Sequence, residues 1–232
     1  MIALTRFQLS GYVRSQRILH PLIAVAMLMS LALIQSPASD RPGNTARLVM
    51  GNLGDVAAFL IPIGAWATRT LLDTQPDVQR DLSFLALGSR SSAAVAGLLA
   101  GYLTNLALAA LLLVFPLYFA ITLGIGVPAI LAGIGLSLLA AVPATLLGAW
   151  TCRAVISDQA WSILALLGGS VMLLVLSMGP LSPLSIPMTG WLRAAQHGPQ
   201  AFTSAFPGMA LHLVVWSALV GALYVLFRRS SS

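Results

Sequence analysis

The pattern of this chain is dominated by long apolar runs separated by short polar segments. A helix needs about 20 apolar residues to cross the hydrocarbon core of a bilayer. The runs that reach or approach this length are residues 19–35, 54–72, 93–121, 128–152, 160–178 and 208–227. The pattern therefore predicts an all-α polytopic membrane protein with six transmembrane helices. Residues 1–232 are predicted to form a single transmembrane domain.

The segment before the first run, residues 1–17, has two different faces. Polar side chains recur at helical spacing on one face, and apolar ones lean on lipid or protein: Arg6, Ser10, Arg14 and Arg17 against Leu4, Phe7, Leu9 and Val13. This predicts an amphipathic helix lying at the membrane surface. A simple orientation anchor is the alternative. The length and patterning of this segment argue against a cleaved signal peptide with its site at residues 36–38.

Residues 75–92 form a polar segment between the second and third runs. Pro76 precedes an acidic residue and is a plausible helix start, and Gly88 is a suitable C-terminal stop. Between them, apolar side chains recur on one helical face: Val78, Leu82 and Leu85. The pattern predicts a short amphipathic helix over residues 77–87. A turn needs only two to eight residues, so a helix here is suited to receiving a partner protein.

The connection between the last two runs, residues 179–207, is long and rich in Pro and Gly. It nevertheless keeps apolar side chains: Leu184, Ile186, Met188, Trp191, Leu192 and Phe202. An exposed loop would be more polar. The composition predicts short outer helices that are interfacial or re-entrant.

Composition places the chain in lipid rather than in water. Of its residues 58% are hydrophobic and 8% are charged, whereas a soluble domain carries roughly 25% charged residues. All twelve basic residues are Arg, and they stand at the ends of apolar runs. That placement is typical of membrane orientation and argues against nucleic-acid binding.

The distribution of Arg predicts the orientation. With the N-terminus inside, the inner segments hold nine: Arg6, Arg14, Arg17, Arg69, Arg80, Arg90, Arg153, Arg228 and Arg229. The outer segments hold three: Arg41, Arg47 and Arg193. By the positive-inside rule, both termini are expected to be cytoplasmic in a multi-pass protein of the cell inner membrane.

Missing residue types exclude several kinds of chemistry. A chain without Lys cannot form the Gly-Lys-Ser/Thr phosphate loop, and a chain without Glu cannot form a His-Glu-x-x-His zinc motif. The three His residues are scattered, and the single Cys152 excludes an internal disulfide. We expect no catalytic site, metal or cofactor in this chain.

One acid, Asp55, falls near the outer end of the second run. Asp is a preferred N-cap, so a cap for a helix beginning at Val56 is the favoured interpretation. The alternative is a coupling carboxylate within the membrane. Close helix packing is indicated elsewhere by Gly97 and Gly101, followed by Thr104 and Asn105 as candidates for hydrogen bonds between helices. The run Gly168-Gly169-Ser170 also indicates a close contact.

The whole pattern resembles the ABC-2 type transporter permeases. The shared features are an N-terminal connecting helix (TRFQLSGYVRSQR), six spans, a cytoplasmic coupling helix ending in Gly88-Ser89-Arg90, and short outer helices between spans five and six. Where many relatives have a Glu-Arg pair at the start of the coupling region, this chain has Arg80-Asp81.

The resemblance implies one permease subunit of a dimer, bound to two separate ABC ATPase subunits that carry ATP and Mg. It implies export of an amphipathic or lipid-soluble compound: a drug, a peptide or a lipid. The coupling helix would bind the ATPase through Arg80, Asp81, Phe84 and Leu85. Spans two and five would line the substrate path, with Asn52, Asp55, Trp66, Thr68, Ser162, Ser170 and Met172 as candidates. The alternatives are an ion-coupled secondary transporter that uses Asp55, and a non-transporting membrane scaffold.

Overall fold

Helices form nearly all of the computed structural model, which describes residues 2–34, 42–75 and 90–230. In chain order the elements are α1 (Ile2–Arg14), α2 (Leu19–Ile34), α3 (Pro42–Leu72), α5 (Arg90–Thr122), α6 (Val127–Trp150), α7 (Gln159–Met178), the 3-10 turn η2 (Ser182–Leu184), α8 (Met188–Gln196) and α9 (Pro199–Ser230). These described ranges contain no strand. The predicted all-α class is confirmed.

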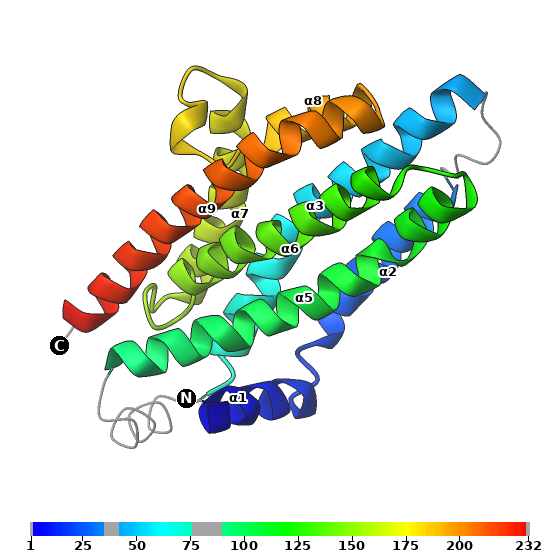
Figure 1. Ribbon diagram of the computed structural model, residues 1–232. Coiled ribbons are helices and arrows are strands. Elements are labelled where there is room, and N and C mark those ends of the chain that lie inside the picture. The colour runs from blue at the N-terminus through cyan, green and yellow to red at the C-terminus, as the bar shows by residue number, and fades with distance from the viewer. Residues whose placement is uncertain (1, 35–41, 76–89, 231–232) are drawn as a thin grey trace.

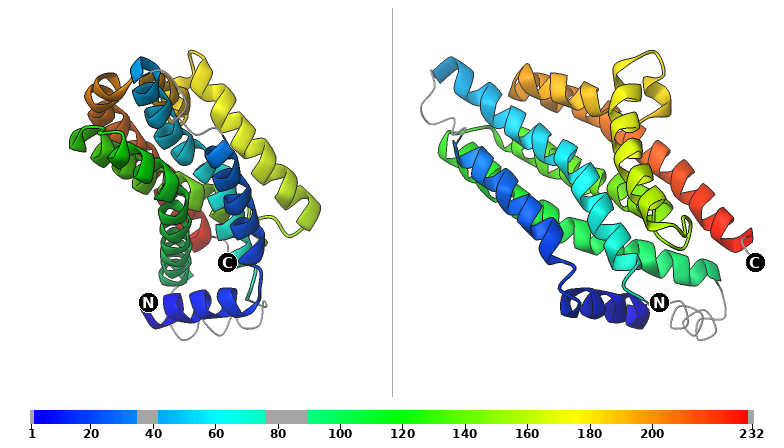
Figure 2. Two further views of the ribbon diagram at one scale, coloured as in Figure 1. Left: turned by 90° about the vertical axis from the view of Figure 1, so that its right-hand side faces the viewer. Right: turned by 180° about the vertical axis from the view of Figure 1, so that it is seen from behind.

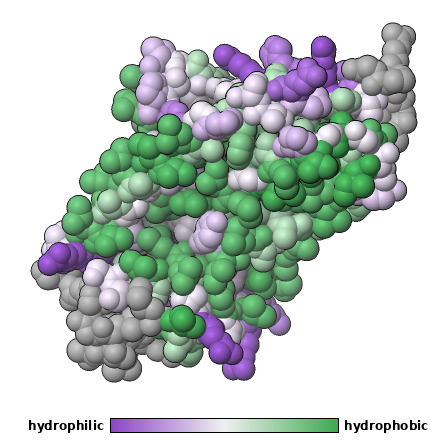
Figure 3. All heavy atoms as spheres, viewed as in Figure 1, coloured by the Kyte–Doolittle hydropathy of each residue, from purple (hydrophilic) through white to green (hydrophobic). Residues whose placement is uncertain are grey.

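Within the described residues, five helices are long and apolar enough to cross a membrane: α3, α5, α6, α7 and α9. The shorter α2 follows α1 with a bend of 72°, and the pair supplies a sixth crossing if it counts as one span. Apolar side chains cover the middle of the bundle, and hydrophilic ones gather towards its two ends (Figure 3). These features indicate a multi-pass membrane protein.

The membrane-length helices run side by side, and α1 lies across one end of them (Figures 1 and 2). Helix α3 is central, because it packs against α5 and α6 and also contacts α2, α7 and α8. We call the end that carries α1 the α1 end; α3 and α6 finish there, and α5 and α7 begin there. The opposite end carries α8, and we call it the α8 end.

Two predicted helix starts were wrong. Helix α3 begins at Pro42 rather than at residue 54, and α9 begins at Pro199 rather than at residue 208. Proline is favoured in the first turn of a helix, where its missing N–H would have no partner in any case. The apolar pattern marks only the part of each helix that is apolar enough for lipid. It does not detect the more polar helical residues that precede this part, which are 42–53 in α3 and 199–207 in α9.

The helix predicted at the N-terminus is present as α1, and its inner face is mostly polar. The bundle buries Thr5, Gln8 and Tyr12, whose side chains bond to Ala96, Gln75 and Thr70. Phe7 and Val13 are exposed. The predicted polar residues Arg6 and Ser10 are exposed as well, whereas Leu9 packs against the buried cluster of Tyr12, Leu71 and Ala100. The face turned to the bundle is therefore neither of the two predicted faces.

The predicted short helices between the last two spans are present as η2 and α8. Helix α8 packs against α3 and α9, and its Trp191 is fully buried. Ile186 and Phe202 on either side are buried too, which explains why this connection keeps apolar side chains. The other predicted short helix, residues 77–87, lies outside the described residues.

Small and polar residues allow α3, α5 and α6 to meet closely. The Asn105 amide on α5 donates to the hydroxyls of Thr68 on α3 (3.0 Å) and Thr145 on α6 (2.9 Å), which confirms its predicted role. Thr104 instead bonds to the Ala100 carbonyl of its own helix. A Cβ on Gly101 would lie 2.7 Å from Thr68 Cγ2, so the predicted close approach is also confirmed.

Candidate functional site

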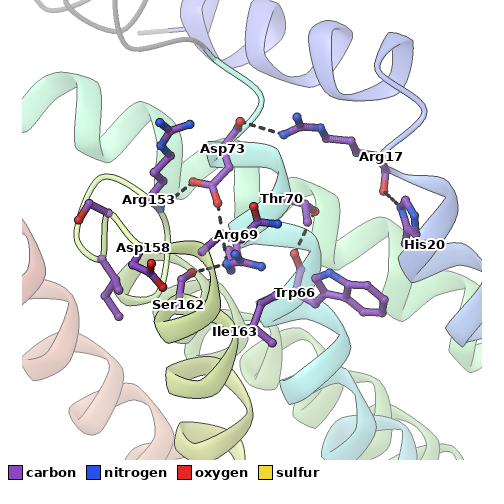
Figure 4. Close-up of a pocket in the computed structure, with 13 residues that line it drawn as sticks. Arg17, His20, Trp66, Arg69, Thr70, Asp73, Arg153, Asp158, Ser162 and Ile163 are labelled. Carbon is purple, nitrogen blue, oxygen red and sulfur yellow. Dashed lines mark hydrogen bonds and ion pairs between the residues drawn. The ribbon is translucent and has the colours of Figure 1, made fainter.

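A cavity of about 680 Å³ opens at the α1 end, between the turn that joins α1 to α2, helix α3, the connection from α6 to α7, and the start of α7 (Figure 4). The turn is made possible by Gln16, whose φ of 59° lies in the left-handed region. It places Arg17 and His20 on the cavity wall. Residues distant in sequence are thereby brought to one place.

Arg69 is the central charged group of this cavity and is only 7% exposed. Its Nε donates to Ser162 Oγ on α7 at 2.5 Å, and the Ser162 hydroxyl donates in turn to the Thr151 carbonyl. Asp73 Oδ2 lies 3.8 Å from the same Nε. Arg69 therefore links the last turn of α3 to the first turn of α7.

Asp73, just after α3, joins three parts of the chain. Its Oδ1 accepts the backbone N–H of Arg153, in the connection from α6 to α7, at 2.7 Å. Its backbone carbonyl accepts a hydrogen bond from Arg17 Nη1 at 2.9 Å. These contacts are drawn in Figure 4. Asp73 is therefore bonded both to the turn before α2 and to the connection before α7.

Helix α7 begins against the same cavity. Asp158 is its N-cap, because Oδ1 accepts the backbone N–H of Trp161 at 2.9 Å. Three cationic side chains line the cavity against two carboxylates: Arg17, Arg69 and Arg153 against Asp73 and Asp158. The charged lining therefore has a net charge of one positive unit.

One wall of the cavity is apolar. Trp66 and Ile163 line it, and they are 37% and 41% exposed on the surface of the bundle. The ring of His20 lies 6.0 Å from that of Trp66. Because α3 and α7 are membrane-length helices, this wall lies on the apolar outer surface of the bundle. The cavity thus joins a charged interior to an apolar surface.

A smaller pocket of about 190 Å³ lies between α2, α3 and α5, and it contains Asn52 and Asp55. The predicted N-cap role of Asp55 was wrong, because α3 starts at Pro42 and places Asp55 in the helix interior. No described residue forms a hydrogen bond or ion pair with its carboxylate. At about 1.5 Å per residue, Asp55 lies about 12 Å along the helix from Arg47 and about 21 Å from Arg69. Asp55 therefore lies inside the membrane-length segment Asn44–Leu72.

The predicted path residues divide among four environments. Trp66 and Ser162 line the large cavity, and Asn52 and Asp55 line the small pocket. Thr68 is fully buried in the core and bonds to Asn105. On α7, the Ser170 hydroxyl bonds to the Leu166 carbonyl, and Met172 is 60% exposed. The predicted partner-binding residues, Arg80, Asp81, Phe84 and Leu85, lie outside the described residues.

The sequence analysis gave no role in a site to the charged side chains of the large cavity or to its histidine: Arg17, His20, Arg69, Asp73, Arg153 and Asp158. One signal was present, since Arg69 and Asp73 stand four residues apart at the end of an apolar run. That spacing places two side chains on one helical face.

Asp55→Leu is expected to stabilise the protein against thermal unfolding in lipid nanodiscs. The carboxylate has no partner to lose, and insertion scales give a cost of about 2.5–3.5 kcal/mol for an acidic residue at the centre of a membrane helix, which falls towards the ends. Asp55 is nearer the Arg47 end, so the expected gain is below that range. Asp73→Leu is the matched control and is expected to destabilise, because it removes the acceptor for the Arg153 N–H. A lower unfolding temperature for Asp55→Leu than for the unmodified chain would show that Asp55 has a structural role.

Comparison with protein-family models, with curated proteins and with solved structures finds no match for this chain. Inference about its function therefore rests on its own geometry and charge.

Proposed function

We propose that this chain is the permease subunit of an ATP-driven ABC-2 type exporter of the cell inner membrane. Two such subunits would form the path for an amphipathic or lipid-soluble compound, and two separate ABC ATPase subunits would drive its movement outward. The observation that carries the proposal is the order of the elements. A helix across one end of the bundle precedes the membrane-length helices, and a short helix at the other end, with Trp191 buried, separates the last two.

The charges support an orientation with the α1 end in the cytoplasm. Among the described residues, the arginines at the α1 end are Arg6, Arg14, Arg17, Arg69, Arg90, Arg153, Arg228 and Arg229, whereas Arg47 and Arg193 are at the α8 end. Cytoplasmic segments of membrane proteins carry the excess of Arg and Lys. In this orientation both termini, and the connection from α3 to α5, are on the side where ATP is available.

The large cavity suits the entry of cargo from the cytoplasmic side. It lies between α3 and α7, the second and fifth of the six proposed crossings, which would line the path under the resemblance. Asp73 stands where α3 passes into residues 76–89, which include the proposed coupling helix. Movement of that helix by the ATPase would act on Asp73, and through Arg69 and Ser162 on α7. The link supplies a route from ATP binding to the cavity.

The test is co-expression of the tagged chain with an ABC ATPase encoded in the same genome. We expect the two proteins to co-purify in equal amounts, and the ATPase to hydrolyse ATP at a different rate after reconstitution with the permease than alone. A catalytically inactive ATPase variant controls for contaminating activity. If no ABC ATPase of that genome binds the chain, the proposal is wrong.

A second candidate function is ion-coupled secondary transport, and the position of Asp55 favours it. An ionisable side chain within a membrane helix, without a partner, is typical of a coupling site. This candidate predicts that no ATPase binds, and that transport stops when the proton gradient is removed while ATP remains. The proposed exporter predicts the reverse on both counts.

A further inference from the structure

We infer that the cavity at the α1 end binds the anionic headgroup, a phosphate or carboxylate, of an amphipathic molecule whose apolar part lies along Trp66 and Ile163. The inference rests on the function proposed above for one point: that the bound amphiphile belongs to the class of compound that is exported. The binding itself is a property of this chain alone.

The first ground is the unused bonding capacity of Arg69. A guanidinium has five N–H donors, and the one on Nε is bound to Ser162. Neither terminal nitrogen forms a hydrogen bond with a described residue. The side chain is nonetheless 93% buried, since its exposed fraction is 7%, and it lines the cavity. A buried cation with free donors has the chemistry to bind an anion, because charge-assisted bonds are the strong ones.

The second ground is the positive electrostatic field around Arg69. Arg17 and Arg153 line the same cavity, and α7 directs its N-terminus, the positive end of its dipole, towards it. Two carboxylates oppose them, Asp73 and Asp158, and Asp158 also caps α7. The lining keeps a net charge of one positive unit. The remaining field favours an anion over a cation.

The third ground is the shape of the site. A volume of about 680 Å³ lies within the range of about 300–1,000 Å³ that is usual for small-molecule sites. It is much larger than a free phosphate requires. Trp66 and Ile163 extend the site from the buried charge to the apolar outer surface, which fits an apolar chain attached to the headgroup. Basic pockets between helices on the cytoplasmic side are typical of sites for anionic headgroups.

The test is native mass spectrometry of the purified chain, without ATPase, in the presence of phosphatidylglycerol or phosphatidylcholine. We expect phosphatidylglycerol to bind about ten-fold more tightly, because both lipids carry a phosphate but phosphatidylcholine adds a choline cation, which the positively charged lining repels. Arg69→Gln should remove this preference. Arg193→Gln, an exposed arginine at the α8 end, is the matched control and should keep it.

Further variants cover the possibility that Arg69→Gln does not fold. Arg17→Gln changes an exposed residue of the cavity wall and should lower the preference several-fold. Trp66→Ala should weaken binding of phosphatidylglycerol while the preference over phosphatidylcholine persists. Inorganic phosphate that binds as tightly as phosphatidylglycerol would show a free anion as the ligand and overturn the amphiphile assignment. Equal binding of the two lipids, or a preference insensitive to Arg69 and Arg17, would overturn the site.

The two proposals can fail separately. If an ATPase co-purifies but the chain binds phosphatidylglycerol no more tightly than phosphatidylcholine, the exporter proposal stands and the cargo class is wrong. If the lipid preference is present but no ATPase binds, the cavity is a headgroup site in a protein with another function.

Discussion

Phe84→Ala combined with Arg80→Asp is expected to weaken association with the ATPase by about one to three orders of magnitude. The sequence predicts that residues 77–87 form the coupling helix, on which Phe84 is the largest apolar side chain. A buried aromatic anchor at an interface is worth about 2 kcal/mol or more, and about 1.4 kcal/mol corresponds to ten-fold in affinity. A charge at the rim of an interface contributes less by itself, but reversing the charge of Arg80 would add repulsion.

The measurement is the dissociation constant of the purified permease and ATPase. The chain offers a matched control in α1, where the same two residue types stand side by side: Arg6→Asp combined with Phe7→Ala. Both residues are exposed on the outer side of α1, so this change should leave the affinity within a few-fold. An equal loss in both double variants would mean that residues 77–87 have no special part in the contact.

Gly148→Ala is expected to destabilise the bundle by about 1–3 kcal/mol, which is the usual range for overpacking a well-packed core. A Cβ at this position would overlap the Ala65 carbonyl oxygen and lie 2.7 Å from Thr68 Cβ. The carbonyl belongs to the backbone of α3, so no rotamer change relieves that contact and α3 and α6 must separate. Separation would also weaken the hydrogen bonds that join Thr68 and Thr145 to Asn105.

Thermal unfolding of the purified chain measures this effect. Gly168→Ala is the control, because no atom lies within 4 Å of a Cβ added there on α7. It should be neutral or slightly stabilising, since Ala is favoured over Gly inside a helix by up to about 1 kcal/mol. Equal midpoints for the two variants would show that α3 and α6 are not packed as closely as this geometry requires.

The sequence by itself determined the class of the protein and the approximate place of its membrane helices. Hydropathy is a local property: about 20 apolar residues need lipid whatever surrounds them. The amphipathic spacing before residue 17 predicted α1, and the apolar residues of 179–207 predicted the short helices there. Asn105 was also foreseen as a link between helices, because an amide inside a span needs partners wherever they are found.

Only the tertiary structure decided what the polar residues do. Asp55 was assigned to a helix start because Asp is a preferred N-cap and precedes an apolar run, and the extension of α3 to Pro42 reversed that assignment. Thr68 and Trp66 stand two residues apart, yet packing buries one in the core and opens the other to the cavity. The contact of Arg69 with Ser162 joins positions 93 residues apart. Such a contact depends on how whole helices pack, and no local pattern of apolar and polar residues encodes it.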